Sequence, residues 1–152
     1  MKKLKIITIC LFISLISSAG IYAQQNKDTM SLLTQNEWTV TFSIGKNDSI
    51  VSVLHFTQTE YINKSSYQQS RSEVSVKYYL SDKLETVFDH DKVGKVFDGR
   101  YIIMINKYSV ISAYEIIKIS ESEFDFIPIN PLDQQTRSSE SRKTFTARVN
   151  PK

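Results

Sequence analysis

Residues 38–44 read WTVTFSI, and the alternation in this stretch decides the fold. Trp38, Val40, Phe42 and Ile44 stand at every second position, with threonine or serine between them. Successive side chains of an extended chain point to opposite faces, so this period of two predicts a β-strand with one buried face.

Similar runs follow almost to the end of the chain, separated by short polar turns. They are IVSVLHF (50–56), EYINKSSYQQ (60–69), EVSVKYYL (73–80), RYIIMIN (100–106), SAYEIIKIS (112–120), SEFDFIPIN (122–130) and KTFTARV (143–149). Eight or nine short strands with hairpin-length turns predict an all-β fold, either a single antiparallel up-and-down barrel or a β-sandwich. We favour the barrel, because closure removes the exposed edges that consecutive hairpins leave.

The first residues have the composition of an export signal. Lys2, Lys3 and Lys5 precede an apolar run over residues 6–16, and small residues precede Gln24. This pattern predicts a secretory signal over residues 1–23, cleaved after Ala23, and therefore a periplasmic or secreted protein. Residues 24–30 are polar and are expected to form a flexible leader, with the barrel domain over residues 31–152.

Charge and cysteine content narrow the function after signal removal. The chain has 19 Lys and Arg against 16 Asp and Glu, and three of the lysines belong to the signal, so the remainder is neutral. A neutral domain is not expected to bind nucleic acid or an anionic membrane, and no membrane span is expected after cleavage. Cys10, the only cysteine, leaves with the signal, which excludes disulfides and thiolate chemistry.

Residues 87–100, VFDHDKVGKVFDGR, contain the densest group of metal-ligand side chains. Asp89 and His90 are adjacent, so in an extended chain they point apart and do not easily share one ion. The spacing matches neither a zinc site nor a calcium loop. We interpret the stretch as polar turns, with metal binding as the alternative, and expect no metal and no cofactor.

No catalytic residues are predicted. His55 lies inside an apolar strand, and no serine stands in a Gly-x-Ser-x-Gly turn. Gly45, Gly94 and Gly99 are too few and too scattered for a phosphate-binding loop. These observations favour a protein that is not an enzyme.

Three stretches together resemble the lipocalin-like domains of secreted Bacteroidetes proteins. They are LLTQNEW (32–38), LHFTQTEY (54–61) and YEIIKISESEFDF (114–126), and the resemblance covers roughly residues 31–149. It departs from the lipocalin Gly-x-Trp pattern at Asn36, a residue that tolerates left-handed backbone angles. The resemblance implies an eight-stranded barrel or a related sandwich, with small apolar ligand binding as an expected function and no catalytic residues. It also suggests an O-glycosylation motif of that phylum at Thr29 or Ser49.

Two hypotheses about function follow. The first is a barrel that binds a small apolar or amphipathic ligand, with Phe42, Phe56, Tyr78 and Phe124 lining its cavity. The second is a periplasmic protein-interaction module of the inhibitor or immunity type, which uses strand edges and loops.

The lipocalin pattern further implies that Arg148 covers the ring of Trp38 and closes the barrel. The alternation of Phe145, Ala147 and Val149 instead predicts that Arg148 points outward.

Overall fold

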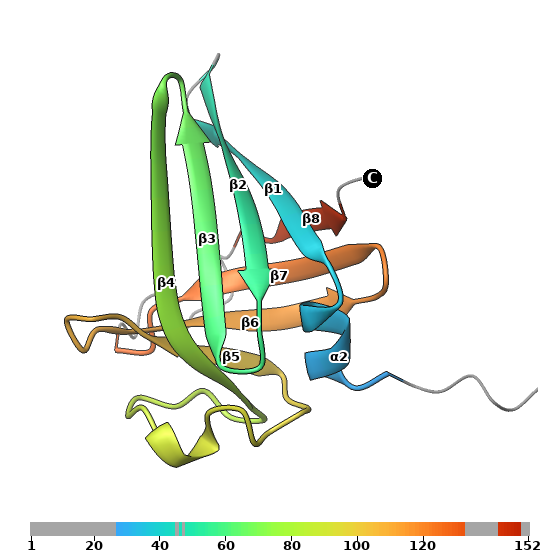
Figure 1. Ribbon diagram of the computed structural model, residues 1–152, viewed down its shortest axis with the longest axis vertical. Helices are drawn as coiled ribbons and strands as arrows, with labels where there is room; N and C mark the ends of the chain where they lie inside the picture. Colours follow the sequence, from blue (N-terminus) through green and yellow to red (C-terminus); the bar gives the residue numbers. More distant parts are fainter. Residues whose placement is uncertain (1–26, 45, 47, 133–142, 150–152) are drawn as a thin grey trace, which may run out of the picture.

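A computed structural model describes residues 27–44, 46, 48–132 and 143–149. Its eight antiparallel strands close into a barrel in sequence order, which confirms the predicted up-and-down barrel (Figure 1). The strands are β1 (Glu37–Ile44), β2 (Asp48–Phe56), β3 (Glu60–Tyr67), β4 (Ser70–Ser81), β5 (Tyr101–Ile105), β6 (Ile111–Ile119), β7 (Glu123–Ile129) and β8 (Phe145–Val149). The predicted signal over residues 1–23 lies outside the described residues.

A short helix, α2 (Thr29–Thr34), packs at one end of the barrel (Figure 1). Asp28 caps it by accepting a hydrogen bond from the Ser31 N–H, and Met30 is buried. The helix therefore includes the last two residues of the predicted leader, because burial of Met30 holds them in place. This end is closed further by Trp38, whose Nε1 donates to the Leu33 carbonyl at 3.0 Å.

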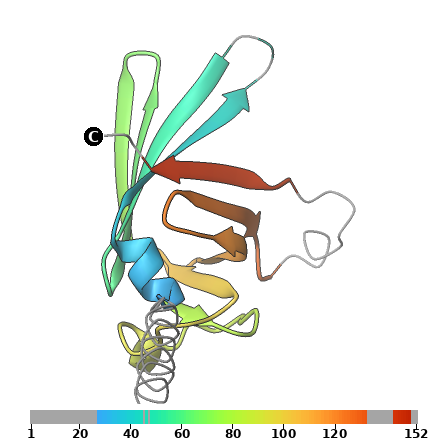
Figure 2. The same cartoon turned by 90° about the vertical axis from the view of Figure 1, so that its right-hand side faces the viewer.

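The eight strands differ in length, so the barrel closes over only part of its height. Strand β5 pairs with residues 77–81 of β4, and β8 pairs with only Trp38 and Thr39 of β1. The β1–β2 and β3–β4 hairpins consequently rise beyond β5–β8, as Figures 1 and 2 show. We call residues 40–44, 48–53, 63–67 and 70–76 the projecting sheet, and the remaining part, where all eight strands meet, the closed part.

The closed part is filled by apolar side chains. Trp38, Leu54, Phe56, Tyr78 and Phe124 each have at most 1% of their surface exposed and belong to one cluster inside the barrel. Edge-to-face contacts connect the rings of Phe56 to Tyr78 and to Phe124, and that of Phe124 to Trp38. Such aromatic pairs add to the stabilisation that comes from burial.

A second apolar cluster lies on the outer face of the sheet, under the segment between β4 and β5. Phe88 from this segment packs against Tyr79, with Ile103 and Ile127 also in the cluster. The segment includes the 3-10 helix η1 (His90–Lys92). It returns to β5 through Gly99, where an added Cβ would lie 2.6 Å from the Ser81 nitrogen, so only glycine fits this close approach.

Candidate ligand-binding face

The four aromatic residues predicted to line a cavity divide between the two parts of the barrel. All four share the inward side of their strands. Phe56, Tyr78 and Phe124 are buried and in ring contact within the closed part. Phe42 is half-buried on the projecting sheet and packs against Phe145, with ring centroids 4.8 Å apart. Three of the four predicted residues thus form the core that fills the closed part, because their rings pack against one another.

A continuous run of aromatic rings lies where the projecting sheet meets β6–β8. The ring of Tyr114 contacts those of Tyr61 and Phe126. The ring of Phe145 contacts those of Phe126 and Phe42. Tyr61 and Phe126 are buried, whereas the others are only half-buried. The run therefore forms an apolar floor that remains partly accessible from the open end of the barrel.

Neutral polar groups stand beside this aromatic floor, on the inward side of β2 and β3. The hydroxyls of Ser52 and Ser65 lie 2.8 Å apart, and Ser65 donates to Asn63 Oδ1 at 2.9 Å. The hydroxyls of Tyr61 and Tyr114 form a second pair at 3.1 Å. Each hydroxyl keeps further hydrogen-bonding capacity, so these groups are able to orient a bound molecule.

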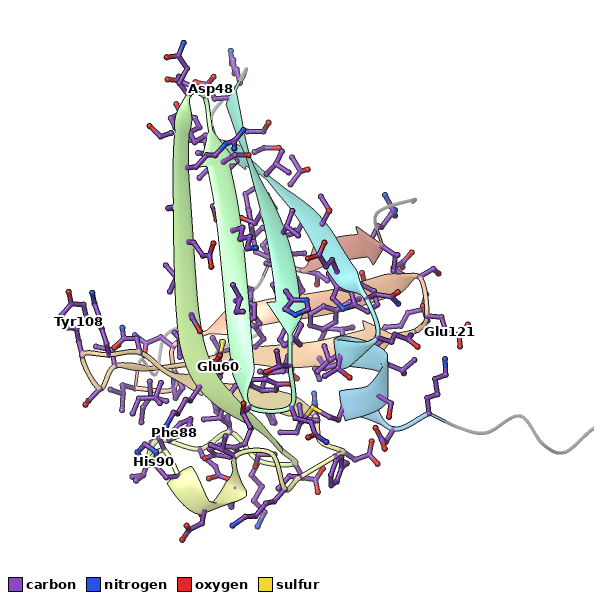
Figure 3. All side chains as sticks on the ribbon, viewed as in Figure 1. Asp48, Glu60, Phe88, His90, Tyr108 and Glu121 are labelled. Carbon is purple, nitrogen blue, oxygen red and sulfur yellow. The ribbon has the colours of Figure 1, made fainter. Side chains whose placement is uncertain are left out.

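The inward side of the projecting sheet is uncharged up to the hairpin tips. The inward positions follow from the strand register and are occupied by Val40, Phe42, Ile44, Ile50, Ser52, Asn63, Ser65, Tyr67, Ser70, Ser72, Val74 and Val76. Asp48, at the tip of the β1–β2 hairpin, is the first charged side chain on this side (Figure 3). Burial raises the pKa of Tyr61 far above its usual range and also raises that of Tyr114, so both hydroxyls stay neutral.

Apolar side chains on this face remain exposed to solvent. Val74 is 53% exposed and Ile44 is 42% exposed, although both point to the inward side. In a fully closed barrel these positions would be covered by opposing strands. Together with the half-buried rings below them, they make the inner face of the projecting sheet the best candidate for a binding surface.

Arg148 does not cover Trp38, which contradicts what the lipocalin pattern implied and agrees with the alternation of the strand. The register places Arg148 opposite Thr39 on one side and Glu123 on the other, and its side chain is exposed. Because side chains alternate along a strand, Ala147 and Val149 point inward and Arg148 points outward. The ring of Trp38 is contacted instead by Phe124, at a centroid distance of 5.8 Å.

The acidic residues of the 87–100 stretch stabilise local structure. Asp89 accepts a hydrogen bond from the Asp91 N–H, and Asp98 accepts one from the Thr29 N–H. His90 stacks edge-on against Phe88 on the outer segment (Figure 3). Within the described residues, no three His, Cys, Asp or Glu side chains gather closely enough to hold a metal ion.

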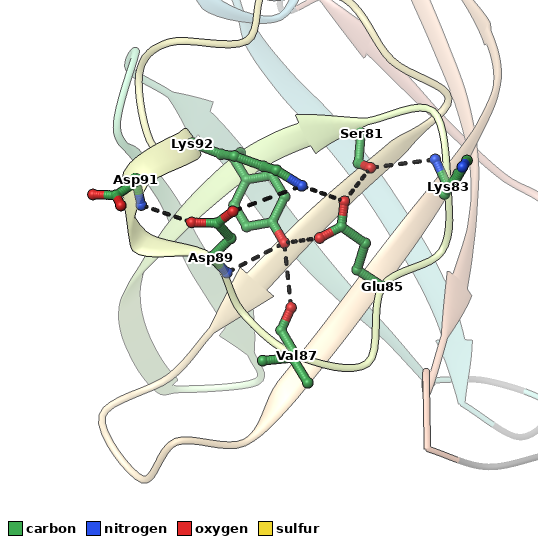
Figure 4. A network of polar contacts seen from close by, with 8 residues as sticks. Ser81, Lys83, Glu85, Val87, Asp89, Asp91 and Lys92 are labelled. Carbon is green, nitrogen blue, oxygen red and sulfur yellow. Dashed lines mark hydrogen bonds and ion pairs between the residues drawn. The ribbon is translucent and has the colours of Figure 1, made fainter.

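Glu85, which the sequence did not single out, lies at the centre of a polar network on the outer face (Figure 4). Its carboxylate accepts hydrogen bonds from Tyr79 at 2.7 Å, from Ser81 at 2.6 Å and from Lys92 at 2.8 Å. Burial raises the pKa of Glu85, but these hydrogen bonds outweigh it and lower the pKa to about 2. The network fastens the segment to β4 through Tyr79 and Ser81, which point away from the barrel interior.

His55, the other histidine, faces outward from β2. Its Nδ1 lies 4.0 Å from a Glu37 oxygen, and its strand neighbour on β3 is Ile62. Two positions were suggested for glycosylation. Thr29 is the first residue of α2. Ser49 is exposed near the tip of the β1–β2 hairpin.

The four residues predicted to line a cavity leave out most of the candidate face. Tyr61, Tyr114 and Phe145 share the inward side with Phe42, and the period of two was the signal that could have identified them. The polar residues Asn63 and Ser65 carried no such signal, because serine and asparagine on a strand ordinarily face solvent.

Comparisons with family models, with curated proteins and with solved structures give no match for this chain. No helix among the described residues combines the length and hydrophobicity required to cross a bilayer.

Proposed function

We propose that this protein is an exported, non-enzymatic barrel that binds a small uncharged amphipathic molecule on the inner face of its projecting sheet. The observation that carries the proposal is the partly accessible aromatic floor beside hydrogen-bonding groups that bear no charge. Ligand sites are typically apolar with a few polar groups that fix orientation. The resemblance to lipocalin-like domains supports the same proposal.

The chemistry of the face restricts the ligand. A charged group placed there would lose hydration without meeting an opposite charge, which is costly in a partly buried site. The serine, asparagine and tyrosine side chains instead suit hydroxyl or carbonyl groups on an otherwise apolar molecule. We therefore expect neutral ligands to bind more tightly than anionic ones of similar size.

A fluorescence titration tests this proposal. An uncharged apolar dye, Nile red, should bind saturably at micromolar concentration, and more tightly than the anionic dye anilinonaphthalene sulfonate. Phe42→Ala should weaken binding because it removes a ring of the aromatic floor. Tyr114→Phe should also weaken binding, because it removes the hydroxyl and keeps the ring. Val87→Ala is the control, because Val87 is 75% exposed on the outer segment between β4 and β5. Absence of saturable binding, or equal affinity in all variants, would contradict the proposal.

Export is the part of the proposal that depends on residues 1–23. Lysines followed by an apolar run and small residues favour processing before Gln24. Intact-mass measurement of protein recovered from the periplasm or medium should give a chain that begins at Gln24. Recovery of the chain with Met1 retained would show that export by this route does not occur.

A protein-interaction module is the second candidate function. The observation that favours it is the edge of β4, where residues 70–76 pair with β3 on one side and with no strand of the described residues on the other. If this function is the correct one, dye binding will be absent while a partner pairs with that edge. The first candidate uses the inner face of the projecting sheet and the second uses its β4 edge, so mutations of the outward edge residues Arg71 and Glu73 separate the two.

A further inference from the structure

Among the described residues, the edge of β4 beyond the end of β5 has main-chain hydrogen-bonding groups without a strand partner. Tyr78 donates its N–H to Thr59, the residue before β3, so the N–H groups of even-numbered residues along this strand point to β3. By the alternation of an antiparallel ladder, the N–H and C=O groups of Arg71, Glu73 and Ser75 point the other way. Strand β5 ends at Ile105, opposite Lys77, and does not reach them. An unpaired edge of this kind is a template for another strand.

A groove continues along this edge beyond the end of β5. Residues 73–76 of β4 form one wall, and Asn106, Lys107 and Tyr108 of the β5–β6 hairpin form the other. Its volume is about 350 Å³, which is enough for a few residues of an added chain. The exposed side chains of Val74 and Tyr108 contribute apolar surface to it.

The charges along the edge are self-complementary. Arg71 and Glu73 both lie on the outward side of β4 and are both exposed. Within the described part of the chain, no ion pair involves either residue. Two β4 strands that run antiparallel about Ser72 bring each Arg71 opposite the Glu73 of the other copy.

We propose that two copies of this protein associate by antiparallel pairing of their β4 edges over residues 70–74, with Ser72 on the two-fold axis. The pairing makes one continuous sheet from the two projecting sheets and keeps both inner faces on the same side. It forms two reciprocal Arg71–Glu73 ion pairs, each between residues whose main chains also exchange hydrogen bonds. The side chains of Arg71 and Glu73 lie on the outward side of β4, away from the proposed ligand-binding face, whereas Ser70, Ser72 and Val74 border both.

Other registers are less favourable. An axis through Glu73 places the two Glu73 carboxylates opposite each other, and like charges in this position destabilise a sheet. An axis through Val74 brings Arg71 opposite Lys77, which is again repulsive. An axis through Ser75 shortens the pairing, because Lys77 and the residues after it already pair with β5.

The proposed register also fills the groove. Gln68 and Gln69 form the two-residue turn between β3 and β4. In the dimer, the turn of one copy lies beside Ser75 and Val76 of the other, which is where the groove is. The interface is short, so we expect a weak dimer with a dissociation constant of roughly micromolar to sub-millimolar order, as for small transient interfaces.

Charge exchange tests the register. Sedimentation equilibrium of the exported wild-type protein should show a reversible monomer–dimer equilibrium that weakens with salt. Arg71→Glu and Glu73→Arg should each weaken dimerisation by about tenfold or more, because each creates two repulsive pairs. A one-to-one mixture of the two variants should recover wild-type affinity as a heterodimer, since both ion pairs are then restored. A monomer up to about 1 mM, above the range expected for transient interfaces, or variants that dimerise like wild type, would overturn the proposal.

Cross-linking provides an independent measurement of the same geometry. Two residues on the axis that are not in a hydrogen-bonded pair have Cα atoms about 4.5 Å apart, which is within disulfide range. Ser72→Cys in a Cys10→Ser background should therefore form a covalent dimer under mild oxidation. Ser70→Cys is the matched control, because it is equally exposed but its counterpart is four residues away across the axis. Equal cross-linking of both variants would show non-specific collision and overturn the register.

Discussion

The projecting sheet continues strands β1–β4 beyond the closed part of the barrel, where all eight strands meet, and only the closed part has a filled interior. In the closed part, the ring of Phe56 contacts those of Tyr78 and Phe124, and all three are almost completely buried. A few residues further along β1 and β4, Ile44 and Val74 point to the same inward side and remain exposed. Side chains alternate between inward and outward in both parts. The parts differ in whether strands β5–β8 lie opposite the inward side chains of β1–β4.

This difference separates stability from binding. The closed part has its apolar surface packed and its polar groups outside, so it supplies the free energy of folding. The projecting sheet has an incomplete inner face and an incomplete edge, which are the two features used by the proposed functions. Mutations in the two parts should therefore have different consequences.

The largest expected effect comes from the centre of the closed part. Phe56→Ala should lower the free energy of unfolding by about 3–5 kcal/mol, because the cavity it leaves is surrounded by packed rings. Phe42→Ala removes the same side chain from a half-buried position of the projecting sheet and should cost only about 1–2 kcal/mol. Urea denaturation measures both. Equal losses would mean that the two parts are equally packed.

The next largest effect is expected in the segment between β4 and β5 on the outer face. Gly99→Ala should lower the free energy of unfolding by about 1–3 kcal/mol, as for other insertions into tightly packed sites. The added methyl group meets the Ser81 backbone, which cannot move without disturbing β4. Lys95→Ala, an exposed change in the same segment, is the control and should stay within about 0.5 kcal/mol. The prediction fails if thermal unfolding does not distinguish the two variants.

Glu85 should make stability depend on acid pH. Its folded pKa of about 2 lies below the ordinary value of 4.5, so its stabilisation is complete above pH 4.5 and is lost as the pH falls toward 2. Glu85→Gln should cost about 1 kcal/mol at neutral pH, a value reduced by the partial exposure of the carboxylate. The difference in free energy of unfolding between Glu85→Gln and wild type should shrink as the pH falls from 4.5 to 2. A difference that is constant across this range would exclude the charge as the cause.

The smallest effect is expected at Arg148. Arg148→Ala should change the free energy of unfolding by no more than about 0.5 kcal/mol, because the side chain is exposed on the outer face. The emission maximum of Trp38 should also be unchanged. Phe124→Leu is the positive control, since its ring contacts Trp38 directly. A shift in Trp38 emission for Arg148→Ala would instead show that Arg148 stacks on Trp38, as the lipocalin pattern implied.

Individual residues show where sequence reasoning succeeded and where it stopped. The strand that begins at Trp38 and its inward residues followed from periodicity, because alternation is a local property of an extended chain. Phe56, Tyr78 and Phe124 were correctly assigned to the inward side, but whether they line a space depends on which rings lie opposite. Phe124 reaches Phe56 from a strand nearly seventy residues away in sequence, and no local pattern encodes that contact.

The sequence by itself determined the fold class, the inward and outward sides of the strands and the neutrality of the domain. It also contained the evidence against Arg148 as a cover for Trp38, since neighbouring strand positions face opposite ways. Only the tertiary structure decided that β5 stops opposite Lys77 and that β8 reaches only two residues of β1. Strand pairing is a long-range choice that fixes which edges and faces remain uncovered, and those uncovered surfaces are where we place the functions of this protein.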